Sequence, residues 1–170
     1  VLLIGGLLLG LSAVTATYAF AQAVETAVNS ATPAADGATP LHDAVRQNDL
    51  AAVEALIKRG ADVKAVTRYG VTPMSLAALT GNAAILRKLL DAKADPNTAT
   101  PGGETALMTA ARTGSIEAVT LLLDRGANVN AKDTVRSQTA LMWAVTENHP
   151  AIVKLIAARG ADVNARTNVT

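Results

Sequence analysis

The chain has no cysteine, and this absence excludes several kinds of site at once. Disulfide scaffolds, thiolate zinc sites, iron–sulfur clusters and cysteine nucleophiles all require the missing thiol. Only two histidines are present, which leaves little for a histidine-based metal site. The formal net charge of +1 is far from the strong basicity that is typical of nucleic-acid binders. We therefore expect no cofactor, no metal and no nucleic-acid partner.

Aromatic side chains are also scarce, with one Trp, one Phe and two Tyr in a chain that is 50% hydrophobic. Alanine supplies much of the hydrophobic half, and alanine favours closely packed helices over sheets. Residues 1–45 contain no Lys or Arg and carry only Glu25, Asp36 and Asp43 as charged groups. The chain therefore has two parts of different character.

Residues 1–24 carry no charge, and this stretch predicts a targeting or anchoring segment at residues 1–23. Val1–Val14 is almost entirely apolar, and the candidate cleavage sites Ala19-Phe20-Ala21 and Ala21-Gln22-Ala23 follow it. This order is typical of a signal peptide, whose apolar core is about 7–15 residues long, although no basic residue precedes the core. A retained membrane anchor and a buried helix are the alternatives. Residues 24–37 mix Ala, Thr, Ser, Pro and Gly without periodicity, which predicts a flexible linker.

The second part repeats one pattern four times. The copies begin at Thr39, Thr72, Thr105 and Thr139, with spacings of 33, 33 and 34 residues. Each Thr precedes an apolar stretch, a Gly or Asn break and a second apolar stretch, which ends in Arg-Gly-Ala in three copies. The Thr hydroxyl suits a helix N-cap, and the Gly suits the left-handed residue that ends a helix. Each copy therefore predicts two short helices, which bury a shared core only when the copies stack.

These motifs resemble those of ankyrin repeats. The clearest matches are Gly70-Val-Thr-Pro-Met-Ser-Leu-Ala-Ala and Leu122-Leu-Asp-Arg-Gly-Ala-Asn-Val-Asn, and the resemblance covers about residues 37–166. It implies an all-α fold, an ankyrin-repeat α-solenoid of helix-turn-helix units with β-hairpin loops. The apolar segment at residues 1–23, expected to be a signal or apolar helix from its composition, precedes the repeats. The resemblance places the repeat domain at 38–170, with about four repeats at 38–70, 71–103, 104–137 and 138–170.

Several positions depart from the family pattern. Lys93 stands where the other copies have Gly, and a left-handed conformation at this residue costs about 1 kcal/mol. Thr67 and Thr100 occupy positions where the family often has a hairpin Asp, so the second unit is expected to be the softest. The fourth unit stays apolar at positions where a terminal repeat usually becomes polar. We therefore expect at least one further unit beyond Thr170 and a chain that is a fragment at both ends.

No sequence pattern indicates catalysis. The G-x-S-x-G, H-E-x-x-H, phosphate-loop and Rossmann motifs are all absent. By the resemblance, His42 is structural and bonds to the backbone of a neighbouring hairpin. His149 precedes Pro150 in a turn between helices and is expected to be solvated. We therefore expect a protein that is not an enzyme.

The resemblance implies that another protein binds the hairpin tips and the exposed side of each first helix. The non-repeating residues at these positions set specificity, and Arg and Tyr concentrate binding energy at interfaces. The predicted partner-binding residues are Arg46, Arg68, Tyr69, Glu104, Arg112, Arg136 and Gln138. Trp143 is expected to stack between repeats instead.

The leading hypothesis is an exported bacterial ankyrin-repeat module that binds a protein partner in the periplasm or after secretion. It contacts a membrane only if residues 1–23 stay uncleaved, in which case it is a scaffold anchored in the inner membrane. A further alternative is that the repeats present substrate to a catalytic part of a larger enzyme beyond Thr170.

Overall fold

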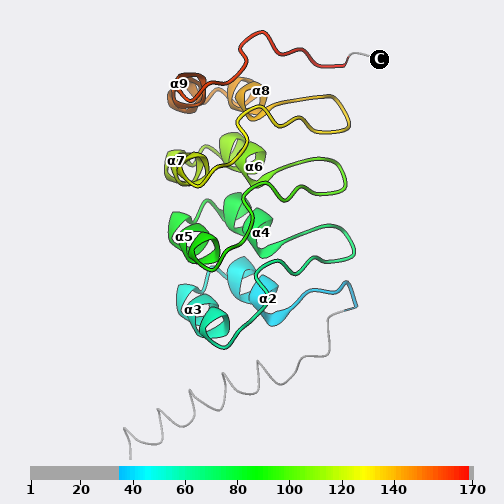
Figure 1. Ribbon diagram of the computed structural model, residues 1–170, viewed down its shortest axis with the longest axis vertical. Coiled ribbons are helices and arrows are strands. Elements are labelled where there is room, and N and C mark those ends of the chain that lie inside the picture. The colour runs from blue at the N-terminus through cyan, green and yellow to red at the C-terminus, as the bar shows by residue number, and fades with distance from the viewer. Residues whose placement is uncertain (1–34, 169–170) are drawn as a thin grey trace, which may run out of the picture. The chain divides into compact units, whose positions relative to one another are not determined.

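The computed structural model describes residues 35–168, so the expected targeting segment and most of the expected linker lie outside the described residues. Within 35–168 the secondary structure consists of eight α-helices. They form four pairs: α2 (Pro40–Arg46) with α3 (Leu50–Lys58), α4 (Pro73–Thr80) with α5 (Ala83–Asp91), α6 (Ala106–Thr113) with α7 (Ile116–Asp124), and α8 (Ala140–Thr146) with α9 (Pro150–Ala158). The pairs stack with the first helices in one layer and the second helices in another (Figure 1). The expected all-helical stack is confirmed for these residues.

The first helix of each pair begins at the threonine that marks the repeat. Thr72 Oγ1 accepts the backbone N–H of Ser75 at 3.0 Å, and Thr105 and Thr139 cap α6 and α8 in the same way. Such caps satisfy amide groups that have no partner inside the helix. The threonine spacing therefore fixes where each pair begins.

Left-handed residues end the helices, as the sequence predicts. The glycines that follow α3, α7 and α9 have φ angles between 85° and 87°, and Lys93 after α5 has the same left-handed conformation at 70°. The turns inside the pairs also have positive φ angles, at Asn48, Gly81, Gly114 and Asn148. Lys93 thus has the left-handed backbone conformation, which is unfavourable for a residue with a side chain.

The core lies between the two helix layers and runs through the stack. Its largest fully buried apolar side chains come from all four pairs: Leu41, Val45, Val53, Ile85, Leu86, Leu89, Leu107, Met108, Leu122, Ile152 and Ile156. Alanines with no exposed surface, such as Ala77 and Ala110, let the first helices approach closely. Neighbouring repeats therefore share one continuous core, which no single pair encloses alone.

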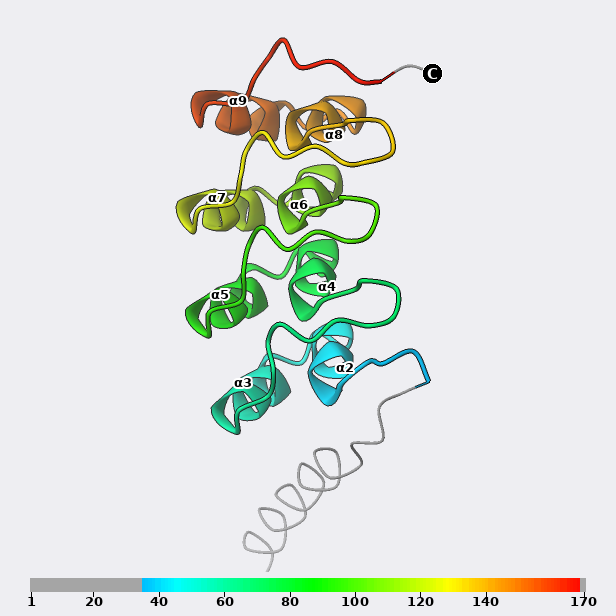
Figure 2. The same ribbon diagram turned by 45° about the vertical axis from the view of Figure 1, so that its right-hand side comes forward.

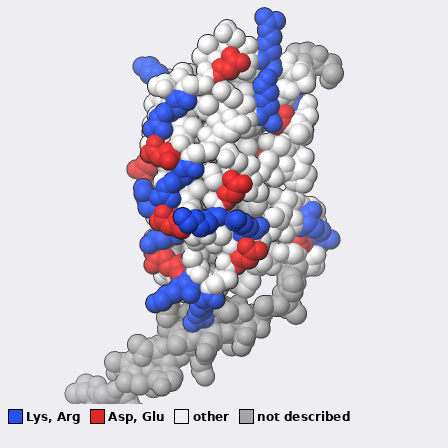
Figure 3. Space-filling view, in the orientation of Figure 1, with Lys and Arg blue, Asp and Glu red and all other residues white. Residues whose placement is uncertain are grey.

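Ion pairs join the second helices on the surface of the stack. Glu54 pairs with Lys88 at 2.9 Å, and two further pairs at 2.8 Å link Asp91 to Arg125 and Asp124 to Arg159. Basic and acidic side chains alternate along this side of the molecule in Figure 3, over α3, α5, α7 and α9. All these groups are partly exposed, so each pair contributes about 0–1 kcal/mol to stability.

Three loops connect the pairs and project to one side of the stack (Figure 2). We call residues 67–71 the first hairpin, 100–104 the second hairpin and 133–138 the third hairpin. Each is closed by a backbone hydrogen bond between its ends, at 2.9–3.0 Å. The described residues contain one isolated antiparallel bridge, Ala99 to Thr105, and no longer strand. The expected hairpins are thus turns with minimal β-structure.

The last residues of the expected linker already contact the stack. The backbone N–H of Arg68 donates to the carbonyl of Asp36 at 2.9 Å.

None of the helices in residues 35–168 has the length and apolar character needed to cross a membrane.

Candidate functional site

A groove of about 390 Å³ lies between the second and third hairpins, and we call it the hairpin groove. Its lining residues come from these two loops and from α8: Thr100, Gly102, Glu104, Asp133, Val135, Arg136, Gln138 and Trp143. The stacking of repeats brings the two loops together, because each loop projects from the same side of its repeat (Figure 2). The volume falls in the range of small binding pockets in proteins, about 300–1,000 Å³.

Three of the seven predicted partner-binding residues line this groove, and a fourth contacts its lining. Glu104, Arg136 and Gln138 line it directly. Arg112 joins them from α6, because its Nη2 lies 3.7 Å from Glu104 Oε1. The guanidinium of Arg112 also lies over the ring of Trp143, 5.8 Å from the ring centroid. The structure therefore places residues from four sequence segments at or beside one cavity: the second hairpin, α6, the third hairpin and α8.

The other three predicted residues lie elsewhere on the stack. Arg68 and Tyr69 occupy the tip of the first hairpin, where the guanidinium lies 5.2 Å from the centroid of the 65% exposed tyrosine ring. Arg46 on α2 forms a 2.7 Å ion pair with Asp43. None of these three lines the hairpin groove.

Asp133 builds the third hairpin from within. One carboxylate oxygen accepts the backbone N–H groups of Val135 and Arg136 at 2.9 and 2.7 Å, and the other accepts that of Gln138 at 3.0 Å. The side chain is buried. In the first and second hairpins a threonine hydroxyl at this place accepts a single amide. The aspartate therefore fixes the shape of the groove wall, and both of its carboxylate oxygens are occupied by backbone amides.

Trp143 has two roles, of which the sequence predicted one. The expected stacking between repeats is seen in its contact with Arg112 of the preceding repeat. Trp143 also lines the groove, and its indole Nε1 is buried without a hydrogen-bond partner. The signal for this second role is weak in the sequence: a single Trp stands where the other copies have Asp43, Leu76 and Thr109.

The two histidines are both structural. His42 is fully buried, and its Nε2 donates to the carbonyl of Val71 at 3.1 Å while its Nδ1 accepts the backbone N–H of Thr39 at 3.1 Å. The expectation for His42 is therefore confirmed. Burial lowers the pKa of His42 below its ordinary value, since the charged ring loses its hydration.

The expectation that His149 is solvated is wrong. Its ring is half-buried, and Nε2 donates to the carbonyl of Arg112 in the preceding repeat at 3.1 Å. Gly114 makes room for this contact, because a Cβ at that position would lie 2.8 Å from the imidazole. Within residues 35–168 no group of three His, Asp or Glu side chains is placed to hold a metal ion.

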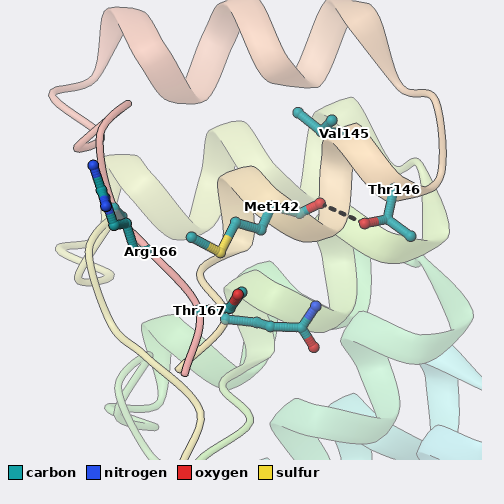
Figure 4. A pocket seen from close by; sticks show the side chains of 7 residues that line it. Met142, Val145, Thr146, Arg166 and Thr167 are labelled. Carbon is teal, nitrogen blue, oxygen red and sulfur yellow. Dashed lines mark hydrogen bonds between the residues drawn. The ribbon is translucent and has the colours of Figure 1, made fainter. Parts of the chain in front are cut away.

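A second recess, which we call the terminal recess, lies on the other side of Gln138. It measures about 730 Å³ and is lined by Gln138, Met142, Val145, Thr146, Ala165, Arg166 and Thr167. In Figure 4 the side chain of Met142 extends from α8 towards the segment that carries Arg166. Val145 is 60% exposed here, whereas its counterparts in the other repeats, Val45, Ala78 and Ala111, are buried. The fourth repeat thus exposes apolar surface that the other repeats cover.

Comparisons with known proteins agree with this architecture. A family model described as ankyrin repeats (3 copies) matches residues 12–100 and 76–167. No curated protein matches the chain. The two matched ranges together span most of the sequence and include every helix that the structure describes. The chain belongs to the ankyrin-repeat family.

Proposed function

We propose that the chain is a non-enzymatic interaction module that binds a protein partner through the hairpin groove and the neighbouring first-helix surface. Ankyrin repeats are generally protein–protein interaction modules and are typically non-catalytic. The observation that carries the proposal is that Glu104, Arg136 and Gln138 line one groove and that Arg112 lies beside Glu104. These residues were predicted from the sequence because their identities differ between the repeats, and the fold brings them together.

The groove presents side chains of the kinds that contribute most to binding at protein interfaces. The guanidinium of Arg112 lies over the ring of Trp143, and this contact reduces the conformational freedom that the two side chains lose when a partner binds. Val135 is 76% exposed at the wall and offers apolar surface. Trp and Arg are also the residue types that most often dominate interface energetics.

The proposed place of action is the periplasm or the cell exterior of a bacterium. The support is compositional: residues 1–23 combine an apolar core with small residues at two candidate cleavage sites. The alternative is that this segment is retained as an inner-membrane anchor. The mass of the mature protein separates the two, because cleavage removes about 21–23 residues from the chain.

Site-specific crosslinking tests the proposed function. A photoreactive residue at position 136 is expected to capture a protein partner in intact cells, because this position lines the groove. Position 87 is the control, since Arg87 is also an exposed arginine but lies on α5 in the other helix layer. Capture of the same proteins from both positions, or of none from position 136, would count against the groove as the binding surface.

A further inference from the structure

We infer that the hairpin groove binds an extended acidic segment of its partner, with a carboxylate at Arg136 and an oxygen acceptor at Trp143 Nε1. This inference rests on the proposed function, because it names the chemistry of the segment that fills the same groove. Three observations support it: Arg136 has no ion-pair partner within 35–168, Trp143 Nε1 has no hydrogen-bond acceptor, and Val135 is exposed at the groove wall.

Both acidic groups of the groove are already engaged. Asp133 accepts three backbone amides. Glu104 accepts the hydroxyl of Thr109 at 3.0 Å and lies next to Arg112. Arg136 is exposed and forms no ion pair with any residue in 35–168. The positive charge of Arg136 is therefore the one that a ligand can neutralise, and a carboxylate matches its planar guanidinium.

Arg166 extends this positive character beyond Gln138. It lines the terminal recess, is exposed and likewise pairs with no acidic group among the described residues. Gln138 lines both cavities, so the two arginines flank one continuous stretch of surface. A segment with more than one carboxylate can thus engage both sides of Gln138.

The indole nitrogen of Trp143 requires an acceptor. An indole N–H only donates hydrogen bonds, and a buried donor without a partner carries an energetic cost. Trp143 Nε1 is such a donor. Carbonyl and carboxylate oxygens accept, whereas Lys and Arg side chains have no acceptor. The nitrogen is enclosed, so the inferred hydrogen bond requires that lining side chains of the groove move when the segment binds.

The form of the segment follows from the walls of the groove. With its side chains an α-helix is about 10–12 Å across, and a space of about 390 Å³ between two loops fits an extended chain better. In an extended chain alternate side chains point the same way. A segment that alternates acidic and apolar residues therefore presents carboxylates to Arg136 and apolar groups to the exposed Val135.

The single tryptophan makes the test direct, since one Trp is expected to give one indole N–H signal in a nitrogen-15 correlation spectrum. The probe is an acetylated octapeptide that alternates glutamate and valine, and the comparison peptides carry lysine or glutamine in place of glutamate. The glutamate peptide is expected to shift the indole signal downfield as the N–H gains an acceptor. The lysine peptide is expected to leave the signal in place.

Two variants complete the experiment. Arg136→Gln is expected to weaken binding of the glutamate peptide about tenfold, the size of one charge-assisted hydrogen bond, and Arg87→Gln is expected to leave binding unchanged. No shift with the glutamate peptide, an equal shift with the lysine peptide, or full binding by Arg136→Gln would overturn the inference.

Failure of the inference is distinguishable from failure of the proposed function. If position 136 captures a partner whose crosslinked segment is neutral or basic, the groove binds protein but the acidic specificity is wrong. If position 136 captures no partner, the proposed function itself fails.

Discussion

The guanidinium of Arg112 in the third repeat lies 5.8 Å from the centroid of the Trp143 ring in the fourth. A cation over an aromatic face contributes about 0.5–1 kcal/mol at a partly exposed site. The same arginine lies near Glu104 on the second hairpin. This contact therefore joins two repeats and a loop at the place where the hairpin groove forms.

A double-mutant cycle tests this coupling. We expect Arg112→Ala and Trp143→Leu to destabilise the fold by amounts that do not add, with a coupling free energy of about 0.5–1 kcal/mol. Leucine is the matched replacement because Leu76 stands at this position in the second repeat. Urea unfolding of the two single variants and the double variant measures the coupling. Additive losses would show that the contact contributes nothing to stability.

The sequence predicted the fold well where local chemistry determines it. The threonine N-caps and the left-handed glycines act within a few residues of their position in the chain, so helix ends follow from the sequence pattern. The stacking follows because short helix pairs cannot bury their apolar faces alone. These rules require no knowledge of distant contacts.

The site was predicted less completely because its geometry depends on neighbouring repeats. The ring of His149 reaches the carbonyl of Arg112 only because Gly114 has no side chain. In the sequence His149 lies 35 positions from Gly114 and 37 from Arg112, with no local signal that they meet. The enclosed nitrogen of Trp143 is likewise a property of the assembled groove.

Lys93 offers a stabilising substitution. Its φ angle of 70° is strained for a residue with a side chain, and we expect Lys93→Gly to raise the free energy of unfolding by about 1 kcal/mol. Lys93→Ala is the control and should give no such gain, since alanine keeps the Cβ. Chemical denaturation of both variants checks the difference.

The reciprocal substitution isolates the backbone effect. A Cβ added at Gly126 would meet nothing within 4 Å, so Gly126→Ala causes no clash. We expect a loss of about 1 kcal/mol that reflects the positive φ angle alone. An unchanged stability in Gly126→Ala would mean that the left-handed conformation carries no cost in this fold.

Asp133 is expected to matter more than an ordinary loop aspartate. Asp133→Ala leaves three backbone amides of the third hairpin without their acceptor, and we expect a loss of about 2 kcal/mol. The matched control is Asp62→Ala, because the Asp62 carboxylate accepts one exposed amide, that of Lys64. The control should lose less than about 1 kcal/mol.

Amide hydrogen exchange locates the effect of Asp133. In Asp133→Ala the amides of Val135, Arg136 and Gln138 are expected to exchange faster, while amides of α2 and α3 keep their protection. Equal losses of stability in Asp133→Ala and Asp62→Ala would show that the three bonds are no stronger together than one.

Buried His42 predicts a loss of stability in mild acid. Its pKa is lowered by burial in the folded state, so the unfolded chain binds a proton first as the pH falls below about 6.5. The contribution of His42 is therefore complete above that pH and declines below it, and urea unfolding at pH 7.5 and pH 5.5 measures the decline. His42→Gln should be less stable at pH 7.5 but should show a smaller decline. The same decline in His42→Gln and in the unsubstituted chain would exclude His42 as its source.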